Sequence, residues 1–122
     1  MYRFLLLLVS VFAFAKTITP SYELNVNHNI IAMELIEGQL LVMTDFGEVL
    51  EISFDKSLKN IKEHSIIKLP NIRGFFDNSY PPKVFSVDVY KGKYLINSEG
   101  DEGTKNLFIF NGGELVLIMG IQ

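Results

Sequence analysis

The chain has no cysteine and no tryptophan, and its only histidines are His28 and His64. Without cysteine it cannot form disulfides, thiolate zinc sites, iron–sulfur clusters or a c-type haem attachment. Its 11 Lys+Arg against 14 Asp+Glu give a net charge of -3, and no basic run is present. That balance argues against nucleic-acid binding. With 48% hydrophobic residues in 122, the composition is that of one packed domain rather than a disordered chain.

The first fifteen residues have the composition of an export signal. Arg3 is followed by an uncharged apolar run over residues 4–14, and Ala13-Phe14-Ala15 forms an A-x-A cleavage site. The alternative is a membrane anchor, but a spanning helix needs about 20 apolar residues. We therefore predict a cleavable signal peptide at residues 1–15. It implies a periplasmic protein with no stable membrane anchor after cleavage.

Residues 16–122 are rich in short alternating or apolar runs, and no stretch keeps a helical period for three turns. The polar segment 56–63 is expected to be a loop or one helical turn, with His64 also in a loop. Alternation over 22–26 adds a further strand. The main strands are expected at residues 30–36, 39–44, 48–54, 65–69, 83–90, 93–98, 105–110 and 114–119. The predicted fold class is therefore all-β and antiparallel.

The two halves of this region resemble each other at an offset of 54 residues. Gly38 then matches Gly92, and apolar residues coincide at several positions, among them Leu41 and Leu95. Four-stranded units with a period near 50 are typical of β-propeller blades. We place blade-like units at about 29–70 and 83–120. The alternative is two unrelated meanders that share only hairpin patterning.

Two blades are fewer than the four that propellers usually need. Three explanations stay open: a truncated or incomplete propeller, a ring closed by other copies, or a small sandwich. Under the first, the strand at 22–26 occupies the place of an N-terminal strand that closes the last blade. Free blade edges also lead us to expect self-association.

The segments Pro20-Ser21-Tyr22-Glu23-Leu24 and Gly38 to Val49, with its Thr-Asp-Phe-Gly-Glu-Val turn, carry a family resemblance. The chain resembles the N-terminal part of the NapL family, WD40-like periplasmic propellers encoded with some periplasmic nitrate reductases. The resemblance implies a non-enzymatic accessory protein with a nitrate reductase component as its partner. It implies no catalytic residues and no cofactor. Without tryptophan, the chain lacks the Trp-Asp dipeptide of WD40 repeats proper.

The polar clusters give no catalytic, cofactor or metal site. The acidic turn over residues 99–103 lacks the spacing of a calcium loop, so a solvated turn is expected. Asp45 and Glu48 are expected at a charged hairpin tip, and both histidines in surface loops. No G-x-S-x-G, dinucleotide or P-loop motif occurs. We therefore predict that the protein is not an enzyme.

The segment from 71 to 82 combines turn formers with an arginine and aromatic rings. Arginine and aromatic residues are the usual anchors of protein interfaces. The candidate partner-binding residues are Arg73, Phe75, Phe76 and Tyr80. The alternative, which we favour from the sequence, is that the two phenylalanines plug the gap between the blades.

These observations favour a periplasmic scaffold that acts through protein contacts. Two other functions stay open. One is a secreted module that binds a small ligand or carbohydrate. The other is a non-functional remnant of a propeller gene.

Overall fold

The protein is built almost entirely from antiparallel strands, in the part that a computed structural model describes, residues 24–54 and 61–121. The first four-stranded sheet has the order β1-β2-β3-β4. Its strands are β1 (Ile30–Ile36), β2 (Gln39–Thr44), β3 (Glu48–Phe54) and β4 (Ile61–Lys68). The sheet is a meander, in which each strand pairs with the next along the chain.

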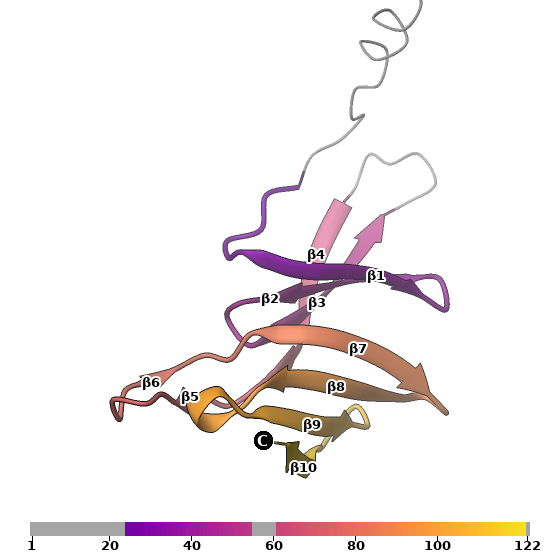
Figure 1. The fold of residues 1–122 in the computed structure, drawn as a ribbon. Helices are drawn as coiled ribbons and strands as arrows, with labels where there is room; N and C mark the ends of the chain where they lie inside the picture. Colours follow the sequence, from indigo (N-terminus) through magenta and orange to yellow (C-terminus); the bar gives the residue numbers. More distant parts are fainter. Residues whose placement is uncertain (1–23, 55–60, 122) are drawn as a thin grey trace, which may run out of the picture.

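The second four-stranded sheet repeats this arrangement, with the strands in the order β7-β8-β9-β10. Its strands are β7 (Val84–Tyr90), β8 (Lys93–Glu99), β9 (Lys105–Phe110) and β10 (Leu115–Ile121), with the 3₁₀ turn η1 (Asp101–Gly103) between β8 and β9. A small hairpin, β5 (Ile72–Arg73) with β6 (Ser79–Tyr80), lies in the connection between the sheets. Figure 1 shows the two sheets stacked, with β1 next to β7.

The predicted all-β, propeller-like fold with an incomplete set of blades is confirmed, because the sheets stay open instead of closing into a barrel. Some details of the prediction are wrong. His64 lies inside β4 rather than in a loop, because β4 begins at Ile61. The segment 24–26 is not a strand, and β10 runs to Ile121. The predicted signal at 1–15 lies outside the described residues. So do residues 56–60 of the polar segment 56–63, whose last three residues belong to β4.

The two sheets share the same strand register at an offset of 54 residues. Ile30 pairs with Thr44 and Val84 pairs with Ser98, and each pair is followed by a register shift at the same place. The first hairpin of each sheet closes on two residues with positive φ, Glu37-Gly38 and Lys91-Gly92. Turns of this kind match the twist of the strands and favour glycine. The repeat in the sequence is therefore also a repeat in backbone geometry.

The main core lies between the sheets. Cross-strand partners share a face of a sheet, so the register identifies which side chains point inward. The first sheet contributes Leu41, Met43, Val49 and Ile67. Leu69, directly after β4, also belongs to this core, and the second sheet contributes Val84, Val87, Ile96 and Phe108. A smaller cluster of Val42, Leu50 and Ile52 lies on the opposite side of the first sheet, packed against Val26.

Candidate interaction surface

The segment predicted as an interaction loop forms a tight hairpin. The Gly74 N–H donates to the Asn78 carbonyl at 2.8 Å, and Asp77 at the tip has a φ of 61°. A Cβ on Gly74 would lie 2.3 Å from Asn78 Oδ1 and 3.0 Å from Tyr80 Cε1. A larger residue would therefore force the Asn78 and Tyr80 side chains to move, so glycine lets the hairpin close around its own polar side chains. The segment is a folded element rather than a slack linker.

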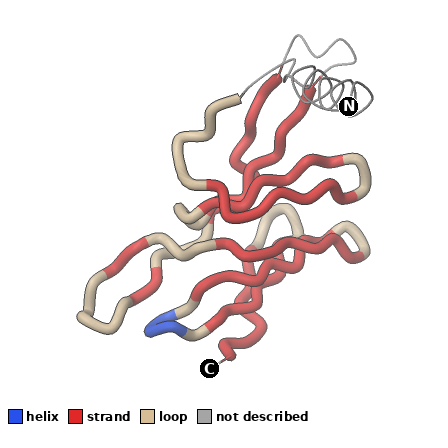
Figure 2. Tube along the Cα trace, turned by 45° about the horizontal axis from the view of Figure 1, so that its top comes forward, coloured by secondary structure: helices blue, strands red, loops and turns tan. Residues whose placement is uncertain are grey.

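The hairpin is held against the β8–β9 turn of the second sheet. The Arg73 N–H donates to Asp101 Oδ1 at 2.7 Å. The Arg73 Nη2 lies 3.7 Å from Glu102 Oε1, and Asp77 Oδ1 lies 4.0 Å from Arg73 Nε. The Phe75 ring lies over Gly103, with Cζ 3.4 Å from the place of a Cβ there. Figure 2 shows the hairpin and the blue helical turn side by side.

The acidic turn therefore has a structural role. The Gly100 N–H donates to the Thr104 carbonyl at 2.7 Å, and Thr104 returns both its N–H (3.0 Å) and its hydroxyl (2.7 Å) to the Asp101 carbonyl. Glu102 takes a positive φ of 51°. Within residues 24–54 and 61–121, no cluster of three acidic or histidine side chains is placed to hold a metal ion. The carboxylates of this turn position Arg73.

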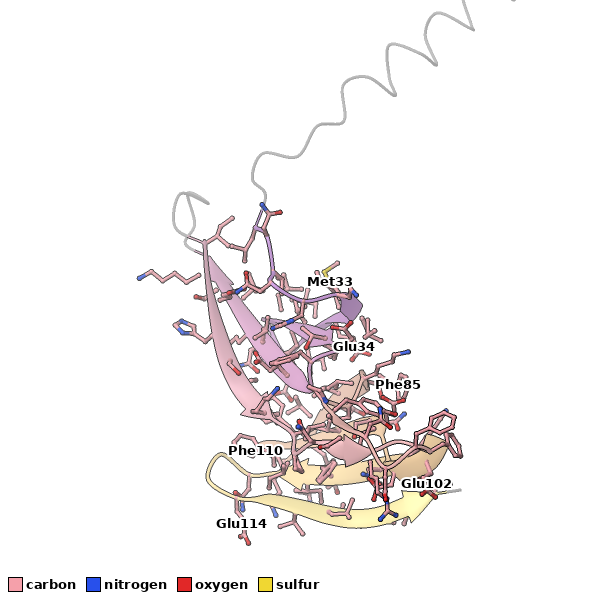
Figure 3. All side chains as sticks on the ribbon, turned by 90° about the vertical axis from the view of Figure 1, so that its left-hand side faces the viewer. Met33, Glu34, Phe85, Glu102, Phe110 and Glu114 are labelled. Carbon is pink, nitrogen blue, oxygen red and sulfur yellow. The ribbon has the colours of Figure 1, made fainter. Side chains whose placement is uncertain are left out.

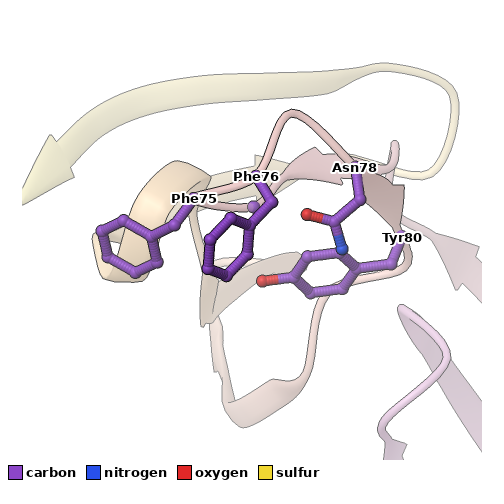
Figure 4. Close-up of a pocket in the computed structure, with 5 residues that line it drawn as sticks. Phe75, Phe76, Asn78 and Tyr80 are labelled. Atoms are coloured by element: carbon purple, nitrogen blue, oxygen red, sulfur yellow. The ribbon is translucent and has the colours of Figure 1, made fainter.

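The two phenylalanines of the hairpin are turned to solvent. Phe75 is 74% exposed and Phe76 is 94% exposed. The expectation that they plug the gap between the blades is therefore wrong, because that gap is filled by the core described above. Figure 4 shows the Phe76 ring between Phe75 and Tyr80, with the Asn78 amide beside Tyr80. These residues and Gly74 line an open hollow of about 390 Å³.

Arg73 differs from the aromatic candidates. Its backbone and its guanidinium both contact the acidic turn, so it joins the hairpin to the second sheet. Its side chain is still 57% exposed. The structure thus brings all four predicted residues, Arg73, Phe75, Phe76 and Tyr80, onto one hairpin, and leaves the two phenylalanines as its most exposed rings.

A second cluster, which the sequence did not reveal, surrounds Phe46 in the β2–β3 turn. The His28 ring stacks on Phe46 with centroids 3.9 Å apart and planes 7° apart. The Lys68 ammonium also lies over the Phe46 ring, 3.7 Å from its centroid. These residues are too far apart in the chain for a local pattern to reveal the contact. His28 lies in a loop, as predicted, but it is half-buried in this stack.

The carboxylates of this turn are also engaged. Asp45 Oδ2 accepts a hydrogen bond from Asn29 Nδ2 at 2.9 Å, and Glu48 Oε1 lies 3.9 Å from Lys68 Nζ. The Asp45 N–H donates to the Asn29 carbonyl at 3.0 Å. The two acids thus fasten the segment before β1 and the end of β4 to the turn.

Residues 24–54 and 61–121 contain no helix with the length and apolarity needed to cross a membrane. Comparison of the chain with protein-family models, with curated proteins and with solved structures found no match in any of the three.

Proposed function

We propose that the chain is a non-enzymatic scaffold that binds a protein partner through the tip of its β5–β6 hairpin. The observation that carries the proposal is the exposure of Phe75 and Phe76 on an anchored hairpin. Burying a phenylalanine side chain contributes about 1.5–3 kcal/mol. Burying these two adjacent exposed rings against a partner would therefore contribute strongly to the free energy of binding.

The rigidity of the hairpin supports the same proposal. Its backbone is closed by hydrogen bonds, and the Asp101 carboxylate and the Gly103 surface hold its base. A preorganised segment loses little conformational entropy on binding. Aromatic anchors of this kind dominate the binding free energy of many interfaces.

The partner we propose is a component of a periplasmic nitrate reductase, and the location is the periplasm. This part of the proposal is supported by the export-like first fifteen residues and by the resemblance of the segment 38–49 to NapL proteins. The hairpin surface itself does not depend on that choice of partner.

The test is a binding titration against immobilised, purified periplasmic nitrate reductase. We expect the full chain to bind and Phe76→Ala to bind at least about tenfold more weakly, as for an interface anchor. Because Phe76 is 94% exposed, the variant should keep the thermal midpoint of the parent chain. Phe46→Leu, a change in the other sheet's turn, is the matched control and should bind like the parent.

The outcomes separate the two parts of the proposal. Equal binding by Phe76→Ala and the parent chain would exclude the hairpin as the binding site. No binding by the parent chain would exclude this nitrate reductase as the partner. A fall in the thermal midpoint of Phe76→Ala would instead give the ring a structural role.

The open hollow beside Tyr80 favours one second candidate, a carbohydrate-binding module. Aromatic rings and the Asn78 amide line this hollow together, and ligand sites combine apolar walls with a few polar groups. Retention of the chain on a glycan array, lost in Tyr80→Ala, would favour this function over protein binding.

A further inference from the structure

The contact between the two sheets joins two different faces. The face that the first sheet turns to the second carries Ala32, Leu41, Met43 and Val49. We call the corresponding face of either sheet its back face. The face that the second sheet turns to the first carries Val87, Tyr94, Ile96, Phe108 and Phe110. We call the corresponding face of either sheet its front face.

In the part of the chain that the structure describes, the repeat therefore leaves one face of each kind without a sheet against it. The front face of the first sheet carries Met33, Leu35, Leu40, Val42, Leu50 and Ile52. Val42, Leu50 and Ile52 are already buried, with Val26 and Ile61 packed against them, so the open part of this face lies on β1. On its first strand, Met33 is 62% exposed and Leu35 is 72% exposed. Figure 3 shows Met33 on the side of the first sheet that is turned away from the second. Strand β1 is the relevant part of this face, because the two sheets contact each other mainly through β7 with β1 and β2.

The back face of the second sheet mixes apolar residues with Asp88 and Lys93, as the back face of the first sheet does with Glu34 and Gln39. Its apolar members are Tyr90, Leu95, Leu107, Ile109, Val116, Met119 and Ile121. Leu95 is equivalent to Leu41, which is fully buried between the sheets, and Leu107 occupies the place of Val49. Tyr90 is 66% exposed. This face thus resembles a surface that is already buried elsewhere in the same chain.

A hollow in this back face marks where a side chain would enter. Inside the chain, Tyr94 of the front face reaches Gln39 of the back face, and its hydroxyl donates to Gln39 Oε1 at 3.1 Å. At the equivalent place on the second sheet, a hollow of about 90 Å³ is lined by Tyr90, Lys93, Tyr94, Leu95 and Ile109. The residue of the first sheet equivalent to Tyr94 is Leu40. Leu40 is therefore the aliphatic side chain that would enter this hollow if the contact between the sheets were repeated.

We propose that the free front face of the first sheet binds the free back face of the second sheet in another copy of this chain. The contact repeats the one between the two sheets, with Leu40 of one copy entering the hollow beside Tyr90 of the next. It is a head-to-tail contact between sheet faces, distinct from pairing at strand edges.

Head-to-tail contacts close into a ring when the rotation per subunit divides a full turn. Propellers of four to eight blades show that stacked four-stranded sheets close in this way. With two sheets per chain, rings of two to four copies fall within that range. The free apolar faces are then buried in every copy.

The test is the mass of the full chain, measured by light scattering behind size exclusion over a range of concentrations. We expect a single species at two, three or four times the monomer mass of 13.9 kDa. A folded species at the monomer mass at every concentration would overturn the proposal. A mass that grows without limit would show an open contact and contradict the ring.

Two variants test the direction of the contact. Met33→Asp places a charge on the front face and Tyr90→Asp places one on the back face, both at exposed positions that should not disturb the core. Each alone should be a monomer. Mixed together they should form a 1:1 dimer, because each supplies the face that the other lacks. If either variant alone still forms the parent species, the head-to-tail contact is wrong.

Phe76→Asp is the matched control. It adds a charge at the tip of the hairpin, away from both faces, and should keep the mass of the parent while losing the proposed partner. Circular dichroism of each variant should retain the β spectrum of the parent chain. Leu35→Asp is a second front-face variant, and if the proposal holds it should also form a dimer with Tyr90→Asp.

Discussion

The two sheets share their register and their first turn, and differ at their second turn. In the first sheet, the Thr44 hydroxyl accepts from the N–H groups of Phe46 (3.2 Å) and Glu48 (3.3 Å) and closes a short turn. At the equivalent position Ser98 is equally buried, and its hydroxyl has no hydrogen-bond partner among residues 24–54 and 61–121. There the chain continues into the longer turn that holds the hairpin. The scaffold is repeated, and the candidate site arises where the repeat is broken.

The largest difference between the sheets should appear at Leu41 and Leu95. Leu41 is fully buried in the core between the sheets, whereas Leu95 is half-buried on the free back face. Leu41→Ala should lower the free energy of unfolding by about 2–5 kcal/mol, and Leu95→Ala by less than about 1 kcal/mol. Urea denaturation of both, in a chain that also carries Met33→Asp to exclude self-association, gives the comparison.

Equal losses for the two leucines would contradict this account of the core. They would mean that the back face of the second sheet is covered within a single copy. Without Met33→Asp, the loss for Leu95→Ala should grow, since the ring would then bury this side chain.

The next difference should appear at the two buried hydroxyls. Thr44→Val keeps the shape of the side chain but leaves two N–H groups of the turn without their acceptor, which should cost about 1–3 kcal/mol. Ser98→Ala removes a hydroxyl that has no partner and should be neutral or stabilising. The measurement is the midpoint of urea unfolding for each variant. A destabilised Ser98→Ala would show that this hydroxyl does have a partner in solution.

Much of the fold could be predicted from the sequence because hairpin signals are local. Alternation and the Glu37-Gly38 and Lys91-Gly92 turns mark the strands directly, and the offset of 54 residues follows from them. The polar start of β4 gives no such signal, because it pairs with β3 while its own side chains are mostly exposed and carry no apolar pattern.

The candidate site was predictable in composition but not in geometry. The aromatic hairpin stood out as a cluster of residue types, yet its exposure depends on the sheets packing without it. The contact of Arg73 with Asp101 and Glu102 joins two segments on either side of β7 and β8. A single sequence gives no signal for such a contact, nor for the stack of His28 on Phe46.

A smaller effect is expected at the β8–β9 turn, which holds the hairpin in place. Asp101→Ala removes the charged acceptor of the Arg73 N–H, and bonds to charged groups contribute about 1.5–3 kcal/mol at most. The loss should be local, so hydrogen exchange at the Arg73 amide should speed up about tenfold with little change in global stability. Asp88→Ala, whose carboxylate accepts from the adjacent Val89 N–H, is the control. Unchanged exchange at Arg73 would show that the hairpin is held by other contacts.

The smallest effect should distinguish the aromatic rings of the two turns. Phe46→Leu keeps an apolar side chain but removes the ring that contacts His28 and Lys68. Such stacking and cation–π contacts at exposed sites contribute about 0.5–1 kcal/mol, so a loss of that size is expected in urea unfolding. Phe75→Leu should cost less, because the Phe75 ring is 74% exposed. A larger loss for Phe75→Leu would mean that the hairpin stabilises the second sheet, and that its rings are retained for folding rather than for a partner.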